Sequence, residues 1–127
     1  MIMKALLLYI LSEILKPIFS ILGIIYGLIT NPKNISNKLF KMAQSNDRFV
    51  NVTCEEIFND KLIKDSNHKF GDGRETISSV IGRNKKVGTL SKNKHWWNSG
   101  VWWENFLHKL DYNHAEKAIG WKSNKTK

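Results

Sequence analysis

The sequence has little cysteine and few acidic side chains. Its single cysteine, Cys54, excludes an internal disulfide, agrees with a reducing compartment and is most simply an ordinary buried or half-buried thiol. The 11 Asp and Glu are outnumbered by 20 Lys and Arg, which gives a net charge of +9. Such a chain is drawn to anionic lipid or to nucleic acid. Its 127 residues allow one membrane segment and one small domain.

Motifs that carry chemistry are also missing. Gly71-x-Gly73 lacks the third glycine and the preceding strand of a dinucleotide-binding loop. Ser78 and Ser79 have no nucleophile-elbow motif around them. No cofactor is therefore predicted, and a binding protein is favoured over an enzyme. A small enzyme with an unrecognised site is left open.

Long apolar runs are absent after Thr30, and the first thirty residues hold the only one. Between Ala5 and Ile29, only Glu13 and Lys16 are charged. A helix of this length would cover ~37 Å, enough to cross a ~30 Å hydrocarbon core with some tilt. The apolar residues favour insertion by about 7 kcal/mol, while a central Glu and Lys oppose it by up to about 6 kcal/mol. Insertion as a lone helix is therefore marginal, unless the two charges neutralise each other as neighbours on the helix.

Other interpretations of this segment stay open. It could be the core helix of a soluble domain, although the remaining chain is too polar to wrap it. It could also break at Pro17 into two short helices, Ile2–Leu15 and Pro17–Ile29, that lie in the membrane interface. A cleaved signal peptide fits less well, because no small-x-small site follows the apolar run. We expect a single or paired membrane segment.

One side of the expected helix carries small and polar residues. At ~100° per residue, they fall within about 100° of one another: Ser12, Glu13, Lys16, Ser20, Gly23, Gly27 and Thr30. Small residues let helices approach closely in lipid. The pattern predicts a helix-association seam through Ser20, Gly23 and Gly27, and hence a homo-oligomer.

The rest of the chain predicts a small basic helical domain. The expected divisions are 1–30 (apolar segment), 31–65 (basic juxtamembrane region), 66–121 (helical domain) and 122–127 (basic tail). Asn31-Pro32 should end the first helix. An amphipathic helix is expected within Lys33–Asn46, and a brief extended piece at Arg48–Thr53.

Capping patterns predict the later helices. Thr53 and Glu56 fit a capping box for a helix over Cys54–Lys64. Asp72 is expected to cap Arg74–Ile81, with Gly82 as its left-handed end. Ser99 is expected to cap Gly100–Leu110, and Asp111 a last helix over Tyr112–Ile119 closed by Gly120.

Basic and aromatic residues mark candidate binding positions. They are Arg83, Lys85, Lys86, Lys94, Trp96 and Trp97. Paired tryptophans beside lysines suit a water–lipid interface. The same mixture could stack on single-stranded bases. Alternatively, Trp102 and Trp103 form the domain core and the other pair covers it.

His108, Asp111, His114 and Glu116 place imidazoles and carboxylates within nine residues. A metal would need at least three of them to converge. The expected cap at Asp111 separates the two histidines, so structural or solvated roles are favoured and no metal is predicted.

Two blocks carry a resemblance: Gly73–Arg83 (GRETISSVIGR) and Leu110–Ile119 (LDYNHAEKAI). Their pairing resembles a group of small, uncharacterised bacteriophage proteins with an apolar N-terminus, an "ETISS…GR" block and a closing "LD…H…KAI" block. Those proteins often have a cysteine directly after the histidine, where this chain has Ala115, so no cysteine-based role is carried over. The resemblance implies a phage origin and a compact C-terminal unit, and no particular activity.

These patterns together predict a mainly α, non-enzymatic, phage-encoded protein anchored in the inner membrane of a bacterial host. Four basic residues just after the apolar segment place the C-terminal part in the cytoplasm by the positive-inside rule: Lys33, Lys38, Lys41 and Arg48. The expected partners are anionic lipid and host proteins, with a role in envelope modification or lysis. The alternative is a peripheral nucleic-acid-binding protein.

Overall fold

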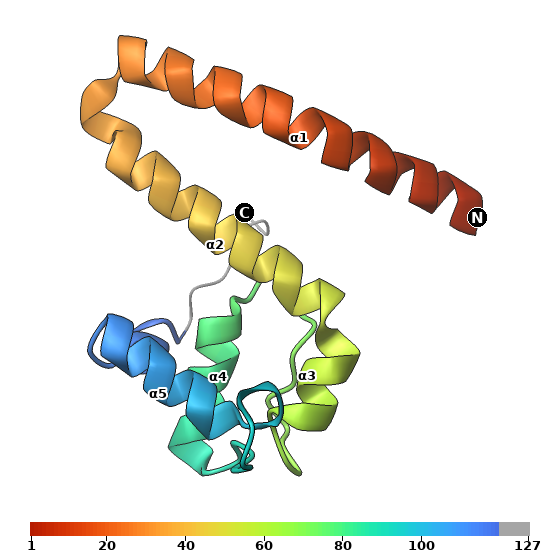
Figure 1. Cartoon of the computed structure of the whole chain (residues 1–127), viewed down its shortest axis with the longest axis vertical. Coiled ribbons are helices and arrows are strands. Elements are labelled where there is room, and N and C mark those ends of the chain that lie inside the picture. Colours follow the sequence, from red (N-terminus) through yellow and green to blue (C-terminus); the bar gives the residue numbers. More distant parts are fainter. Residues whose placement is uncertain (120–127) are drawn as a thin grey trace. The chain divides into compact units, whose positions relative to one another are not determined.

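The computed structural model describes residues 1–119 and is mainly helical, as predicted (Figure 1). The described part of the chain contains no strand, and its one isolated β-bridge joins Ile63 to Leu90. The elements in chain order are α1 (Ile2–Thr30), η1 (Pro32–Asn34), α2 (Ile35–Thr53), α3 (Glu55–Lys61), α4 (Ile77–Val87), η2 (Trp96–Asn98), α5 (Gly100–Leu110) and α6 (His114–Lys117).

The chain divides into two compact units. The N-terminal unit is Met1–Lys41 and the C-terminal unit is Met42–Lys127, so the division falls within α2. The predicted boundaries at residues 30 and 65 stay predictions, and the predicted basic tail 122–127 lies outside the described residues.

α1 is a single helix that continues through Pro17. The alternative of two short helices hinged there is therefore wrong. Proline removes one backbone hydrogen bond and crowds the preceding turn. The long apolar stretches on both sides of Pro17 nevertheless remain helical. The helix ends at Thr30, because Asn31 precedes Pro32 and leaves helical geometry as predicted.

A second prediction is also wrong. Arg48–Thr53 lies in the last turns of α2 and is not extended. The reason is a tertiary contact made by Asn51, which is fully buried. Its side-chain amide satisfies backbone groups of the loop before α4: the carbonyls of Asp72 (3.2 Å) and Glu75 (2.7 Å) and the N–H of Gly71 (2.9 Å).

α3 starts without the predicted capping box. Cys54 occupies the N-cap position and makes no side-chain cap. The Thr53 hydroxyl donates instead to the Phe49 carbonyl oxygen across 2.9 Å, inside the preceding helix. Continuation of α2 to Thr53 leaves that side chain on the helix surface, where it can share the carbonyl oxygen one turn back.

α4 begins and ends later than predicted. Its N-cap is Thr76, whose hydroxyl accepts a hydrogen bond from the Ser79 N–H, so capping by Asp72 is wrong. Asp72 closes a local turn by accepting from the Arg74 N–H at 2.9 Å. Gly82 lies inside the helix, and Gly88, with φ of 74°, is the left-handed end.

The prediction for α5 is confirmed, with Ser99 accepting from the Trp102 N–H across 3.2 Å. α6 is shorter than predicted and starts at His114. Its N-cap is Asn113 in left-handed geometry, so capping by Asp111 is wrong. Asparagine adopts that geometry more readily than most residues.

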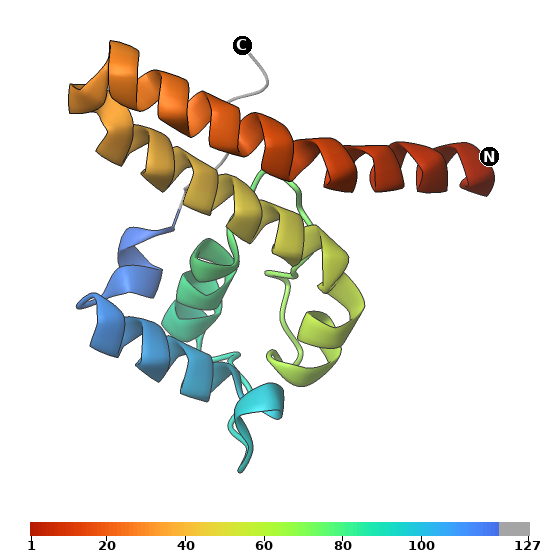
Figure 2. The same cartoon turned by 45° about the horizontal axis from the view of Figure 1, so that its top comes forward.

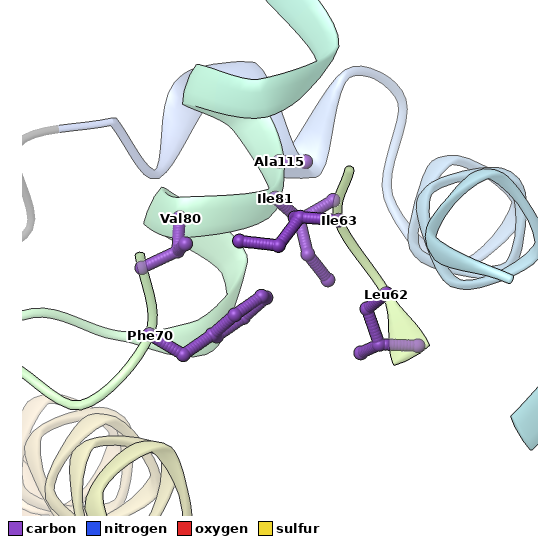
Figure 3. Packing of buried hydrophobic residues seen from close by; sticks show 6 residues of the cluster. All are labelled: Leu62, Ile63, Phe70, Val80, Ile81 and Ala115. Atoms are coloured by element: carbon purple, nitrogen blue, oxygen red, sulfur yellow. The ribbon is translucent and has the colours of Figure 1, made fainter. Parts of the chain in front are cut away.

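The core of the C-terminal unit is small and gathers around α4 (Figure 3). It consists of Leu62, Ile63, Phe70, Val80, Ile81 and Ala115. Trp103 and Leu107 pack against it from α5. Helices α4, α5 and α6 pack against one another, as Figure 2 shows.

Candidate functional site

The apolar surface of α1 is exposed along its whole length, and the helix is long and apolar enough to cross a membrane. The two charges between Ala5 and Ile29 neutralise each other, because Lys16 Nζ lies 2.9 Å from Glu13 Oε1. The polar stripe predicted from the sequence therefore contains one internal ion pair.

The residues of the predicted association seam differ in their surroundings. Apart from its chain neighbours and the adjacent backbone of α1, no described atom lies within 4 Å of a Cβ built on Gly23. Gly27 is instead covered by its own chain, because such a Cβ would lie 2.6 Å from Lys38 Nζ. Ser20 is half-buried. Helix association through these residues stays a prediction, and at Gly27 it would require Lys38 to move.

The ETISS block forms the start of α4 and the residues just before it. Glu75 is 6 % exposed, and its Oε1 accepts hydrogen bonds from the Ser79 hydroxyl and from Arg83 Nε, each at 2.6 Å. Ser78 and Ser79 are buried. The block is therefore a buried polar network and does not present an accessible nucleophile.

Lys85 has internal partners as well. Its ammonium lies 2.8 Å from Glu104 of α5 and 3.2 Å from Glu116 of α6. The hydrogen bond to Glu104 is the main reason that the pKa of Lys85 is raised. Of the predicted basic positions, Lys85 thus joins α4 to α5 and α6, and Arg83 pairs with Glu75, while Lys86 and Lys94 are exposed.

An aromatic surface covers η2 and the outer face of α5. We call Trp96, Trp102 and Phe106 the tryptophan surface; they are 56 %, 42 % and 40 % exposed. Trp102 stacks on Phe106 with ring centroids 5.5 Å apart, and Trp96 lies 6.3 Å from Trp102. Trp103 lies beneath them and contacts the core. The prediction that Trp102 and Trp103 form the domain core therefore holds for Trp103 and not for Trp102.

Basic and polar groups border the tryptophan surface. A cavity of ≈ 200 Å³ is lined by Trp102, Asn105, Phe106 and Lys109. In the preceding loop, His95 stacks on Trp97 at 5.4 Å, and Trp97 is 50 % exposed. Amphipathic rings beside ammonium groups are suited to lipid headgroups or to unpaired bases.

The histidine and carboxylate cluster forms no metal site within residues 1–119. Asp111 binds the His114 ring and the Lys117 ammonium, and both contacts lower the pKa of its carboxyl. His108 Nδ1 accepts from the Asn113 N–H at 3.3 Å. These groups shape the turn between α5 and α6.

Sequence reasoning missed Asp47. Its carboxylate accepts a hydrogen bond from the Ile77 N–H at 2.8 Å and so holds the first turn of α4 against α2. Burial raises the pKa of this carboxyl, against opposing contributions from the Ile77 and Ser78 hydrogen bonds and from His114. A short polar residue in the middle of a helix gave no signal of this long-range contact.

The raised pKa of Asp47 predicts a pH-dependent contribution to stability. A carboxyl that binds its proton more tightly when folded stabilises the fold at low pH, and this contribution is lost as pH rises through the folded pKa. Asp47→Asn removes the titration but keeps an acceptor for Ile77. Wild type should therefore gain free energy of unfolding relative to this variant as pH falls from 7 towards 4. Urea unfolding at each pH measures the difference, with Asp60→Asn, an exposed carboxylate, as the control. A difference that does not change with pH would contradict the prediction.

Two surfaces are thus available for interaction: the apolar face of α1 and the tryptophan surface of α5. Each is formed mostly by residues whose side chains are exposed. Of the remaining predicted site residues, Arg83 and Lys85 have internal partners, Trp97 stacks on His95, and Lys86 and Lys94 are exposed. A comparison of this chain with protein-family models, curated proteins and solved structures finds no match.

Proposed function

We propose that the chain is a phage-encoded, non-enzymatic protein anchored by α1 in the inner membrane of a bacterial host. The observation that carries this proposal is the exposure of α1: nearly all large apolar side chains of this 29-residue helix are exposed. Water opposes such exposure, at about 25 cal/mol per Å² of apolar surface, whereas hydrocarbon does not. The Glu13–Lys16 ion pair supports the same proposal, because it reduces the charge that lipid would meet.

Charge supports a cytoplasmic C-terminal unit. The flank that follows α1 is basic, with Lys33, Lys38 and Lys41 close to the helix. The positive-inside rule places the more basic flank in the cytoplasm. There the C-terminal unit would bind anionic lipid or host components and so alter the host envelope or assist lysis.

The tryptophan surface supports a contact role for the C-terminal unit. Trp96 and Trp102 remain exposed, although indole rings would favour a dry core. Membrane headgroups suit these rings, and attachment to α1 keeps the unit near the membrane. The second candidate, a peripheral nucleic-acid-binding protein, is favoured by the same exposed rings beside Lys109.

Fractionation of cells that express the full chain tests the anchor. Wild type should sediment with membranes, resist high salt and nuclease, and be released by detergent. Leu11→Arg combined with Ile18→Arg places two charges on the apolar side of α1, each at a cost of about 2.5–3.5 kcal/mol. Most of this variant should move to the soluble fraction.

The matched control adds the same two charges outside α1. Asn46 and Asn67 are exposed, so Asn46→Arg combined with Asn67→Arg should stay with the membranes. Wild type that stays soluble without detergent would refute the anchor. Release by nuclease or high salt alone would favour the nucleic-acid alternative, because such binding weakens steeply with salt.

A further inference from the structure

The chain folds back on itself after α1, and Lys38 marks the contact. Its ammonium donates to the Gly23 carbonyl oxygen across 3.3 Å and 15 positions of sequence. The space that it occupies is the one a side chain at residue 27 would fill. Gly27 is accordingly the one buried residue of α1.

A hollow of ≈ 230 Å³ lies at this turn, and we call it the turn hollow. Its polar lining includes Thr30, Asn31, Asn34 and the Lys38 side chain, with Tyr26 on one wall. No carboxylate lines it. The side chains around it supply an ammonium and two amides, which are donors for an oxyanion.

Charge around the turn hollow is positive and uncompensated by nearby acids. Residues 1–41 contain five lysines and one acidic residue, Glu13. That carboxylate pairs with Lys16 within α1. Lys33 and Lys41 flank the turn and are both exposed. A phosphate group fits these donors, because its charged oxygens accept charge-assisted hydrogen bonds, which are stronger than hydrogen bonds between neutral groups.

If the proposed membrane anchor is correct, the length of α1 determines the level in the membrane at which the turn hollow lies. Its 29 residues extend ~43 Å, which exceeds a ~30 Å hydrocarbon core by several residues. An ammonium is costly in hydrocarbon, so Lys38 and the segment it contacts belong at headgroup level. About twenty residues before Gly23 then span the core and bring Lys4 to the opposite interface.

We propose that the turn hollow binds a phosphate group, with Lys38 as its charge partner and Asn31 and Asn34 as further donors. At headgroup level, the turn hollow lies beside the phosphates of the lipid headgroups. An anionic phospholipid is therefore the expected source, and free phosphate is the source to be distinguished from it.

The test uses the full chain in nanodiscs of phosphatidylcholine and phosphatidylglycerol, followed by native mass spectrometry of the lipids that stay bound. Wild type should retain phosphatidylglycerol with roughly fivefold enrichment over the bulk ratio, the effect of one lysine at an anionic surface. Lys38→Ala should abolish the enrichment. Lys41→Ala removes the same charge three residues away and should preserve it.

A third variant separates position from charge. Gly27→Ala keeps every lysine, but its Cβ would displace the Lys38 ammonium, so the enrichment should fall. If added inorganic phosphate displaces the bound lipid and binds in its place, free phosphate is the ligand. Equal effects of Lys38→Ala and Lys41→Ala, or no enrichment in wild type, would overturn the phosphate site while the anchor stands. Failure of wild type to enter the nanodiscs would refute the anchor and the site that rests on it.

Discussion

Gly82→Ala is expected to destabilise the C-terminal unit by about 3 kcal/mol. In an unpacked helix, the same change would stabilise by about 1 kcal/mol, because alanine is the better helix former. Here a Cβ on Gly82 would lie 2.1 Å from the Ala115 carbonyl oxygen. That atom belongs to backbone, so α4 and α6 must separate to admit the methyl group. Separation would open the core beside Ile81 and Ala115.

Urea unfolding of the full chain in detergent micelles measures this loss. All five tryptophans follow residue 95, so their fluorescence reports on the C-terminal unit and not on α1. Gly73→Ala is the matched control, because its Cβ would meet only the Val52 side chain, at 3.3 Å. The control should change the free energy of unfolding by less than about 1 kcal/mol. An equal effect of the two alanines would show that close packing at Gly82 does not support the fold.

Arg83→Met should destabilise the same unit by about 2–4 kcal/mol. Methionine keeps the length of the apolar stem but removes the guanidinium that pairs with Glu75. Breaking a buried ion pair typically costs 3–5 kcal/mol because the remaining charge stays desolvated. The Arg83 side chain is 30 % exposed, which reduces the expected cost.

A double-mutant cycle with Glu75→Gln isolates the ion pair. The two changes together should cost less than the sum of the single changes, with a coupling of about 1 kcal/mol or more. Lys86→Met is the control on the same helix: its side chain is exposed, so the cost should stay below about 1 kcal/mol. Additive effects in the cycle would contradict a role for the pair, and a large effect at Lys86 would point to net charge instead.

Periodicity and capping patterns predicted those elements that are determined by residues close together in the sequence. The apolar stretch of α1 and the Asn31-Pro32 exit are such elements, and both predictions are confirmed. Ser99 and α5 belong with them, because a serine cap acts within one turn. At Asp72 and Asp111, equally good local patterns failed, because each carboxylate found a different partner.

The corrections in α2 and in the loop before α4 involve three asparagines, of which Asn51 and Asn84 are buried and Asn59 is half-buried. Asn51, Asn59 and Asn84 use their amides to satisfy backbone groups of the loop between α3 and α4. In a sequence, asparagine usually indicates a turn or a surface position, because its side chain can hydrogen-bond to nearby backbone groups in place of a helix or sheet hydrogen bond. In this fold, the partners lie 11 to 24 positions away, beyond any local pattern.

The sequence by itself determined the helical class, the apolar helix that precedes a basic unit, and the ion pair at Glu13 and Lys16. These follow from spacing along one helix, where neighbours are fixed by 3.6 residues per turn. Only the tertiary structure decided that Lys85 of α4 pairs with α5 and α6, that Arg83 pairs with Glu75 of the loop before α4, and that Trp102 stays exposed while Trp103 reaches the core. It also brought Lys38 over Gly27. Such contacts depend on which faces meet after the chain has folded back, and spacing along one helix does not encode that.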